Sequence, residues 1–328
     1  MIQDEEGAMY HIIVNPASKS GRGIRIWEEC QKVLNHRKVA YEVFFSEGYG
    51  QIQKKVQELT EHATERVDIL VFGGDGTMNE VISGIKKLDM VRIGYIPSGS
   101  SNDLARDMKL TGKPSELIDK ILNGNSGEPM DVGSLRFQHV GEEHSILYRE
   151  DEFAKTKRFN VSCGIGFDAA VCEEALHSKL KETLNRMRLG KLVYLMIAVK
   201  QIIKARKVSC DLYLDDKEPI HLKRFLFVAC MNHKYEGGGF MFGPDASYHD
   251  GSLDLCVVGN IPKALVFLAL PTALKGKQFM FPYLDQYRAK KVRIRTSEPL
   301  WVHTDGEVYV KADDITIWCE DEQISMIM

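Results

Sequence analysis

Residues 71–84 read VFGGDGTMNEVISG and place a glycine-rich turn with one aspartate between an apolar run and a segment of helical spacing. The three glycines permit positive φ angles and let backbone N–H groups approach a phosphate, because no Cβ stands in the way. Thr77 can cap the following helix and reach a phosphate oxygen. Asp75 would repel a polyphosphate unless a cation joins the two, and oxygen-preferring Mg²⁺ suits that task. Taken alone, the same residues also suit an ordinary tight turn.

Strand-like and helix-like segments alternate around this turn. Apolar runs rich in β-branched residues occur at 9–14, 39–45, 67–72 and 91–96. Segments of helical spacing lie between them, roughly at 24–35, 50–62 and 77–88. Such alternation predicts a parallel sheet covered by helices on both faces.

Polar and glycine-rich clusters follow all four predicted strands: NPASKSGRG, SEG, GGDGT and PSGSSND. The carboxyl ends of parallel strands meet at one sheet edge, where ligands bind and the N-termini of the following helices point. Contacts to phosphate oxygens are available from Ser18, Lys19, Ser20 and Arg22, although a solvated loop has the same composition. The chain has no G-x-x-x-x-G-K-[ST] motif, which excludes a P-loop kinase. The four loops together predict one ligand site.

The fourth loop also admits a purely structural reading. In PSGSSNDLAR a helix begins near Asn102, so Ser100, Asn102 and Asp103 suit simple N-terminal capping. A cap requires one such residue, whereas this loop offers five. The surplus favours a functional role beside the capping one.

The composition is that of an ordinary folded protein. Of 328 residues, 44% are hydrophobic and 27% are charged, and the formal net charge of -3 argues against a nucleic-acid binder. Seven scattered cysteines without a C-x-x-C pair predict free thiols in a reducing compartment. Residues 1–8 have no signal-peptide pattern and are left out of the fold prediction. The apolar run at 264–274, ALVFLALPTAL, is too short to span a membrane, so a cytoplasmic protein is expected.

A second glycine motif, GIGFDA at 164–169, matches the dinucleotide fingerprint G-x-G-x-x-A. That fingerprint belongs in a βαβ unit whose second strand ends in an acidic residue roughly 20 positions on. Here a long helix-like segment follows instead. A nicotinamide or flavin site is therefore not predicted.

Several motifs together resemble the diacylglycerol kinase catalytic-domain family, which includes bacterial lipid kinases and the sphingosine and ceramide kinases. They are NPASKSGRG, VFGGDGTMNEVISG, IPSGSSNDLAR, NVSCGIGFDAAV, DASYHDGSLDL and HTDGE, in matching order over nearly the whole chain. The resemblance implies an α/β nucleotide-binding domain at 9–130, similar to that of NAD kinases and phosphofructokinases. It also implies a C-terminal β-sandwich for the lipid substrate at 131–328, with the last segment able to pack back on the first domain.

The resemblance further implies the residues of an ATP site. ATP contacts fall on Asn15, Pro16, Ala17, Ser18, Lys19, Ser46, Gly74, Asp75, Gly76, Thr77, Met78, Asn79, Glu80, Ser100 and Asp103. Asp75 and Asp103 resemble the acidic pair that orders the catalytic Mg²⁺, partly through waters. The sequence departs from its relatives at Lys19 and Ser20, where they commonly pass directly from serine to glycine, so the register of this loop is left open.

Two further sites are implied by the resemblance. The D-G-E at residues 305–307 supplies Glu307 as proton acceptor, with Asp305 as the rival for that role; a lipid hydroxyl attacking a γ-phosphate needs such a positioned carboxylate. By composition alone the D-G-E is a turn. A structural Mg²⁺ is implied in ASYHDGSLDL, held by the Asp250 side chain and the main-chain oxygens of Ser247 and Ser252. His249 stands where many bacterial members have another acid, which predicts a lower metal affinity.

The lipid side of the protein is predicted from composition. Residues 176–207 mix apolar and basic side chains, which suits an anionic membrane surface as well as a helix pair buried on one face. The basic residues are Lys179, Lys181, Arg186, Arg188, Lys191, Lys200, Lys204, Arg206 and Lys207. The segments MFGPDASY and ALVFLALPTALKG suit either an acyl cleft or ordinary core and loop.

The sequence thus predicts an ATP- and Mg²⁺-dependent kinase of diacylglycerol or a similar lipid alcohol, peripheral at the inner membrane face. Its expected partner is a lipid substrate presented at the membrane surface, with no nucleic acid, and a homodimer is left open. The alternatives are an NAD kinase-like enzyme with a soluble substrate, a phosphofructokinase-like sugar kinase, and a non-catalytic lipid-binding module.

Overall fold

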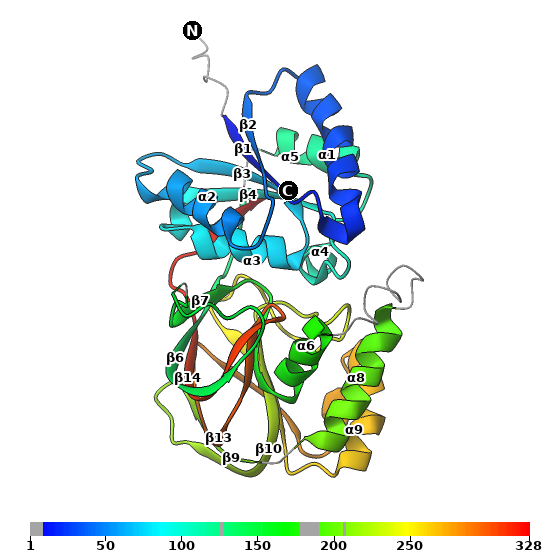
Figure 1. Cartoon of the computed structure of the whole chain (residues 1–328), viewed down its shortest axis with the longest axis vertical. Coiled ribbons are helices and arrows are strands. Elements are labelled where there is room, and N and C mark those ends of the chain that lie inside the picture. Colours follow the sequence, from blue (N-terminus) through cyan, green and yellow to red (C-terminus); the bar gives the residue numbers. More distant parts are fainter. Residues whose placement is uncertain (1–8, 125–126, 152, 178–189, 206–207) are drawn as a thin grey trace. The chain divides into compact units, whose positions relative to one another are not determined.

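The computed structural model describes residues 9–124, 127–151, 153–177, 190–205 and 208–328. Two compact units share this chain. The first consists of the chain up to Val132 together with Asp321–Met328, and the second is Gly133–Glu320. Each unit has its own sheet and its own hydrophobic core (Figure 1).

The first unit is an α/β structure built on a largely parallel sheet. Its elements begin β1 (Tyr10–Val14), α1 (Ser18–His36), β2 (Tyr41–Phe45), α2 (Gln51–Glu61), β3 (Val67–Gly73), α3 (Asp75–Gly84), η1 (Leu88–Met90) and β4 (Val91–Pro97). These four strands pair in parallel, in the order β2-β1-β3-β4. The predicted alternation and parallel sheet are confirmed.

Both faces of this sheet are covered. Phe72 of β3 packs against Trp27 of α1 and belongs to the same core as Leu117 of α5 (Pro114–Asn123). Ile69 and Val71, which alternate with it along β3, are fully buried on the other face. A parallel strand buried on both faces reads as a continuous apolar run, as VDILVF does.

Helix α1 begins earlier than predicted, at Ser18 instead of residue 24. Its first turn is irregular, because Lys19 has φ +49° and Gly21 has φ +86°. These two left-handed residues accommodate the extra residues in the loop after β1. A Cβ on Gly23 would overlap the Asn15 carbonyl and the Ser18 hydroxyl, so this glycine permits the early start.

The end of the chain returns to the first unit's sheet. β15 (Ile324–Ile327) runs parallel to β4 and antiparallel to β5 (Gly127–Met130), which completes the order β2-β1-β3-β4-β15-β5. The second unit is therefore inserted in sequence between two adjacent strands of one sheet.

The second unit is a β-sandwich, as predicted. Its strands are β6 (Gly133–His144), β7 (Thr156–Phe159), β8 (Ser162–Gly166), β9 (Val208–Leu214), β10 (Ile220–Met231), β11 (Leu253–Gly259), β12 (Leu284–Ala289), β13 (Lys291–Thr304) and β14 (Glu307–Cys319). The pairings among these described strands are antiparallel. β10 and β13 each pair with β9 through their first half and with β8 through their second half. The long strands thereby pass from one layer to the other.

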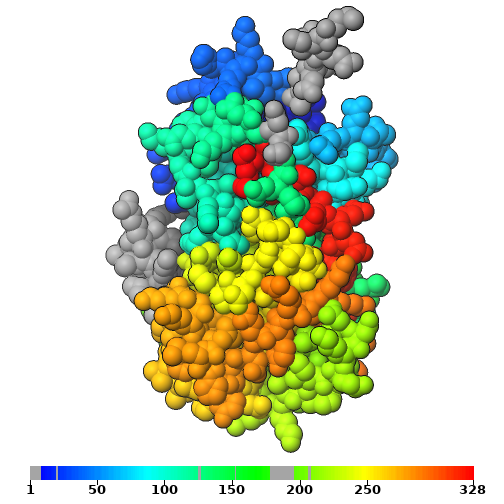
Figure 2. Space-filling model, turned by 180° about the vertical axis from the view of Figure 1, so that it is seen from behind, coloured from blue at the N-terminus to red at the C-terminus, as the bar shows by residue number. Residues whose placement is uncertain are grey.

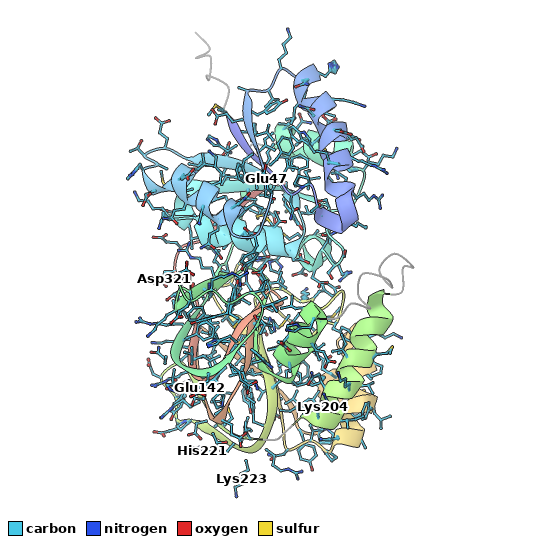
Figure 3. All side chains as sticks on the ribbon, in the orientation of Figure 1. Glu47, Glu142, Lys204, His221, Lys223 and Asp321 are labelled. Atoms are coloured by element: carbon cyan, nitrogen blue, oxygen red, sulfur yellow. The ribbon has the colours of Figure 1, made fainter. Side chains whose placement is uncertain are left out.

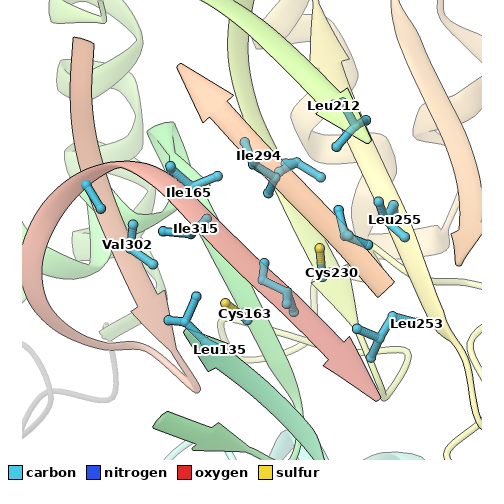
Figure 4. Packing of buried hydrophobic residues seen from close by; sticks show 14 of the residues in the cluster. Leu135, Cys163, Ile165, Leu212, Cys230, Leu253, Leu255, Ile294, Val302 and Ile315 are labelled. Atoms are coloured by element: carbon cyan, nitrogen blue, oxygen red, sulfur yellow. The ribbon is translucent and has the colours of Figure 1, made fainter. Parts of the chain in front are cut away.

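The sandwich core lies between these layers. Figure 4 shows Ile165 of β8, Ile294 and Val302 of β13, and Ile315 of β14 turned toward one interior. A second apolar cluster lies between the sheet and its helices, which are α6 (Phe167–His177), α8 (Gly190–Lys204) and α9 (Lys263–Ala269). The GIGFDA motif forms the passage from β8 to α6. Because β8 pairs only antiparallel among the described strands, the motif is not part of a βαβ unit.

The basic segment at 176–207 is described only in part. Lys179, Lys181, Arg186, Arg188, Arg206 and Lys207, and the side chain of Lys191, lie outside the described residues. Within the described part, α6 and α8 form a packed helix pair, and Lys200 forms an ion pair with Glu174. Among the described helices, none combines the length and apolarity that a membrane crossing requires.

Candidate active site

The GGDGT turn joins the end of β3 to the N-terminus of α3, which begins at Asp75 rather than at residue 77. The predicted use of its glycines was wrong in one respect, since none of Gly73, Gly74 and Gly76 has a positive φ. A Cβ on Gly73 would overlap the side chain of Thr77, so this glycine serves close packing of the turn on its own helix. The α3 N-terminus favours an anion at this edge, because the helix dipole is positive there.

The loops after β3 and β4 meet backbone to backbone. A Cβ on Gly74 would lie 2.9 Å from Cα of Gly99. Ser98 N–H donates to the Gly73 carbonyl at 2.7 Å, and Asn102 Oδ1 accepts from Gly99 N–H at 3.0 Å. Asn102, in the left-handed region at φ 50°, closes this second loop on itself. Two turns from separate strands are thereby joined into one surface.

The loop after β1 contacts the same two turns. Asn15 Nδ2 donates to Thr77 Oγ1 at 3.1 Å, and the hydroxyls of Ser18 and Ser98 lie 2.7 Å apart. Ser46, after β2, donates its N–H to the Val14 carbonyl at 2.9 Å. All four predicted loops therefore lie at one sheet edge. Ser98 is 1% exposed. It was missed in the sequence analysis, because Ser100, which is exposed, is the same residue type two positions later in the same loop.

Asp75 and Asp103 form an acidic pair at this edge. The Asp75 carboxylate accepts the N–H groups of Asp103 at 3.1 Å and Leu104 at 3.4 Å, and so caps α4 (Asp103–Asp107). Asp103 forms an ion pair with Arg106. Burial first, and then the charges of Asp75 and Asp103, raise the pKa of Tyr95 well above its usual range. Two carboxylates at a helix N-terminus suit a Mg²⁺ ion beside a polyphosphate.

Two residues of the predicted ATP set have other roles in the structure. Met78 is fully buried in the core of the first unit. The Glu80 carboxylate accepts the Gly50 N–H at 2.8 Å, at the N-terminal cap of α2. Burial raises the pKa of Glu80, against the hydrogen bonds from the α2 N-terminus. Among the others, Ala17 and Lys19 are exposed, Pro16 is half-buried and Asn79 is buried.

The D-G-E forms a tight hairpin turn in the second unit. Thr304 of β13 pairs with Glu307 of β14 across Asp305 and Gly306. Both turn residues are left-handed, with φ +51° and φ +83°, as in the type I′ turns that favour Asp-Gly. The Glu307 carboxylate accepts the Tyr309 hydroxyl at 2.8 Å. The turn therefore places Glu307 at the first position of a strand.

Asp305 anchors this turn. Its carboxylate accepts four hydrogen bonds from residues 160–162: Asn160 N–H at 2.9 Å, Asn160 Nδ2 at 2.7 Å, Val161 N–H at 2.8 Å and Ser162 N–H at 3.0 Å. A carboxylate with four donors is a structural element, and proton transfer to it would break these bonds. The pairing could not be predicted, because Asp305 and Asn160 are distant in sequence.

Arg288 lies at the loop for which a structural Mg²⁺ was predicted. Asp250 Oδ2 lies 3.2 Å from Arg288 Nη1, and its Oδ1 accepts the Ser252 N–H at 3.1 Å. Asp254, which is 3% exposed, lies 3.0 Å from Arg288 Nη2. Ser247 is half-buried in the same loop. The guanidinium already provides the positive charge, so a cation at Asp250 has to displace it.

Two family models match the chain. Residues 9–135 match the Diacylglycerol kinase catalytic domain, and residues 161–319 match the YegS C-terminal NAD kinase beta sandwich-like domain. The "Putative lipid kinase YtlR" of Bacillus subtilis is 28% identical over 91% of this chain and 93% of its own length. The Diacylglycerol kinase of the same organism is 27% identical over 75% of this chain and 73% of its own length.

Two solved structures share the fold. A diacylglycerol kinase structure from Bacillus anthracis superposes with a TM-score of 0.69 at 22% identity and covers 98% of this chain and 96% of its own. Yeast NADH kinase superposes with a TM-score of 0.50 at 10% identity, covering 98% and 84%. These likenesses agree with the α/β unit and the β-sandwich described above.

Proposed function

Because the chain belongs to the diacylglycerol kinase catalytic-domain family, we propose that it is an ATP-dependent lipid kinase. The reaction transfers the γ-phosphate of ATP to the hydroxyl of diacylglycerol or a similar lipid alcohol. The observation that supports this most is the convergence of three loops on one sheet edge around Asp75 and Asp103.

The first unit supplies the phosphate end of the site. The N-terminus of α3 and the hydroxyls of Ser18 and Thr77 would stabilise the oxygens of a polyphosphate bound at this edge. Asp75 and Asp103 are the residues that would hold Mg²⁺, which neutralises charge on the transferring phosphoryl group when it is bound. Asp75 has a second task, since it also fixes the α4 N-terminus.

The second unit supplies the proton acceptor. We assign this role to Glu307, because the Asp305 carboxylate already accepts the four hydrogen bonds that fix the turn. A base that orients the attacking hydroxyl needs an oxygen directed to the substrate. Asp305 is then the anchor of the turn.

A surface of the second unit supports membrane association. Exposed apolar side chains occur on α8, α9 and two short helices, η2 (Leu270–Lys275) and η3 (Gln278–Met280). The apolar-basic surface, as we name it, consists of Met196, Ile203, Phe267, Leu268, Leu274 and Met280 with the exposed Lys204, Lys263, Lys275 and Lys277. Figure 3 labels Lys204 at the end of α8, and Figure 2 shows the orange segment that includes α9 and η2 at the surface of this unit.

The composition of this surface suits an anionic membrane. Residues 255–284 include three lysines and no acidic residue. Lys263 Nζ donates to the Ile203 carbonyl at 2.5 Å and so joins α9 to the end of α8. Apolar side chains rimmed by lysines insert into the headgroup region while the cations meet anionic lipids. A protein bound in this way would reach its lipid substrate while the substrate stays in the bilayer.

The main alternative is an NAD kinase-like enzyme, which the fold likeness to yeast NADH kinase allows. A sugar kinase and a non-catalytic lipid-binding module are the others. One experiment separates them: labelled ATP is supplied with a panel of lipid alcohols in mixed micelles, with NAD, and with a hexose phosphate. We expect label only in lipid. Label in NAD or in the hexose phosphate would refute the proposal. It would also be refuted if the wild type bound lipid without transferring label and the Asp75→Asn variant bound lipid equally well.

A further inference from the structure

Three buried ionisable side chains meet behind the D-G-E turn. His303 Nε2 lies 3.2 Å from Asp168 Oδ2 and 3.2 Å from Glu236 Oε1. The His303 side chain is 0% exposed, that of Asp168 7% and that of Glu236 10%. They come from β13, α6 and the loop after β10. We name them the His303 cluster.

The other ring nitrogen of His303 contacts the turn itself. Gly306 N–H points at His303 Nδ1 at 3.2 Å. A backbone N–H only donates, so Nδ1 must present a lone pair. The ring proton is then on Nε2, between the two carboxylates. This contact therefore selects one tautomer of the histidine.

The cluster retains protons strongly. Burial disfavours the imidazolium, but the charge of Glu236 and the hydrogen bonds with both carboxylates outweigh it and raise the pKa of His303 well above its usual range. Burial likewise raises the pKa of Asp168. These charges favour the imidazolium, whereas the Gly306 N–H, 3.2 Å from Nδ1, opposes a proton on that nitrogen. We give the contact the greater weight, because a backbone N–H can only donate, and assign the neutral ring with its proton on Nε2.

Two glycines of the GIGFDA motif make room for this arrangement. A Cβ on Gly164 would overlap Asp168 Oδ2 and lie 2.5 Å from His303 Nε2. Gly166 has φ +108°, and a Cβ there would overlap the Leu226 carbonyl. The motif that resembles a dinucleotide fingerprint thus serves to bring Asp168 onto His303.

We propose that His303 is a positioning residue for the phosphoryl transfer: its Nδ1 accepts the Gly306 N–H and fixes the turn that presents Glu307, while Asp168 and Glu236 hold the ring in that tautomer. This inference rests on the proposed lipid kinase function only through the role of Glu307. This inference also explains why two carboxylates face Nε2, because two acceptors stabilise the ring proton on Nε2 relative to Nδ1.

The same three groups also have the composition of a divalent cation site. In addition, Glu236 Oε2 is buried and has no hydrogen-bond partner among the described residues. Coordination would need the Nε2 lone pair, which places the proton on Nδ1 against the Gly306 N–H. The tautomer therefore separates the two assignments.

The first experiment reads the tautomer directly. The chain has 10 histidines, so ¹⁵N-histidine-labelled full-length protein is compared with its His303→Asn variant to assign the His303 ring signals. We expect Nδ1 to have the shift of an unprotonated nitrogen and Nε2 that of a protonated one. Both nitrogens protonated, or Nε2 unprotonated with one equivalent of zinc or manganese by elemental analysis, overturns the proposal. This measurement of the tautomer does not depend on whether the protein phosphorylates a lipid.

The second experiment uses two conservative variants that divide the roles of the ring. Counted in bonds from Cβ, the Asn amide oxygen stands where Nδ1 was, and the Gln amide nitrogen stands where Nε2 was. His303→Asn therefore keeps an acceptor for Gly306, and His303→Gln keeps a donor to the carboxylates. We expect kcat of His303→Asn to exceed that of His303→Gln by at least about tenfold, because misplacing a reacting group by about 1 Å costs on the order of 100-fold.

The KM for ATP should be equal in both variants, since the nucleotide contacts are in the other unit. Equal kcat values, or a lower kcat for His303→Asn, overturn the proposal. Wild-type protein that phosphorylates no lipid refutes the proposed function instead, and the tautomer measurement then decides the inference alone.

Discussion

Gly74 and Gly99 touch through their backbones, so that a Cβ built on Gly99 would lie 2.5 Å from the Cα of Gly74. Real Cβ atoms do not approach other carbons this closely. The two glycines therefore have their main structural role in letting the loops after β3 and β4 meet. The acidic pair depends on this meeting, because Asp75 follows one glycine and Asp103 follows the other loop.

We expect Gly99→Ala to separate these loops. Overpacking of this kind costs about 1–3 kcal/mol, so the free energy of unfolding should fall by that amount in urea titration. ATP affinity, measured by calorimetry, should fall as well. Gly48→Ala is the matched control, since a Cβ at Gly48 meets nothing within 4 Å. An unchanged ATP affinity in Gly99→Ala would show that the phosphate site does not depend on this contact.

Asp75→Asn should retain the fold and lose activity. The amide oxygen still accepts one N–H of the α4 N-terminus, so the stability cost should stay near about 1 kcal/mol. Turnover should drop by at least about 100-fold, because one electrostatic element for the transferring phosphoryl group is lost. Circular dichroism and steady-state kinetics check the two parts. Near-normal turnover in a folded variant would refute the role of Asp75.

The contacts of the D-G-E turn predict different effects for substitutions of its two carboxylates. Glu307→Gln keeps the hydrogen bond with Tyr309 and removes basicity, so the chemical step should slow by about 10²–10⁴-fold with ATP affinity intact. Asp305→Asn should act on stability instead, by about 2 kcal/mol, because an amide nitrogen would face N–H donors. Single-turnover kinetics and urea titration distinguish them. A stable Asp305→Asn without activity, beside an active Glu307→Gln, would reverse the assignment.

Local pattern was sufficient to predict much of the first unit. Each parallel strand is an apolar run and each loop has its own polar residues, so the segment order and the shared sheet edge follow from the sequence. The start of α1 was missed, because SKSGRG contains two glycines and polar residues typical of loops. The left-handed Lys19 that allows the helix to begin there has no sequence signal.

Long-range pairing explains what the sequence did not show. The four donors to Asp305, the pairing of Arg288 with Asp250 and Asp254, and the His303 cluster all join residues from separate strands and loops. For the D-G-E, composition predicted a turn, and the family resemblance predicted a proton acceptor. The hydrogen bonds from residues 160–162 give Asp305 a structural role, and they support the proposal that Glu307 is the base.

Arg288 gives a test of the structural Mg²⁺ that was predicted for the second unit. Arg288→Met leaves the buried Asp254 without its cation, which should cost about 2 kcal/mol, and Mg²⁺ should then raise the melting temperature. We expect no such Mg²⁺ effect while Arg288 is present. Both proteins carry Asp75→Asn and are measured without nucleotide, so that Mg²⁺ at the proposed ATP site does not contribute. Arg293→Met is the control, since Arg293 forms a comparable ion pair with Asp314 of β14. Stabilisation by Mg²⁺ with Arg288 intact would show that a metal displaces the guanidinium.

The apolar-basic surface gives the last prediction. Leu268, Leu274 and Met280 are 63%, 49% and 73% exposed, which is unusual for large apolar side chains on one set of neighbouring helices. Replacing all three by Glu removes insertion into the headgroup region and adds charge that anionic lipid repels. Cosedimentation with vesicles containing phosphatidylglycerol should fall at least about tenfold.

Two comparisons make this result specific. Ile146→Glu changes a side chain of similar exposure, 49%, in the loop after β6, and should bind vesicles as the wild type does. In detergent micelles, where substrate no longer has to be met at a bilayer, the triple variant should keep its kcat. An equal loss of vesicle binding in Ile146→Glu would mean that added negative charge lowers binding wherever it is placed. Unchanged binding of the triple variant would exclude this surface as the membrane contact.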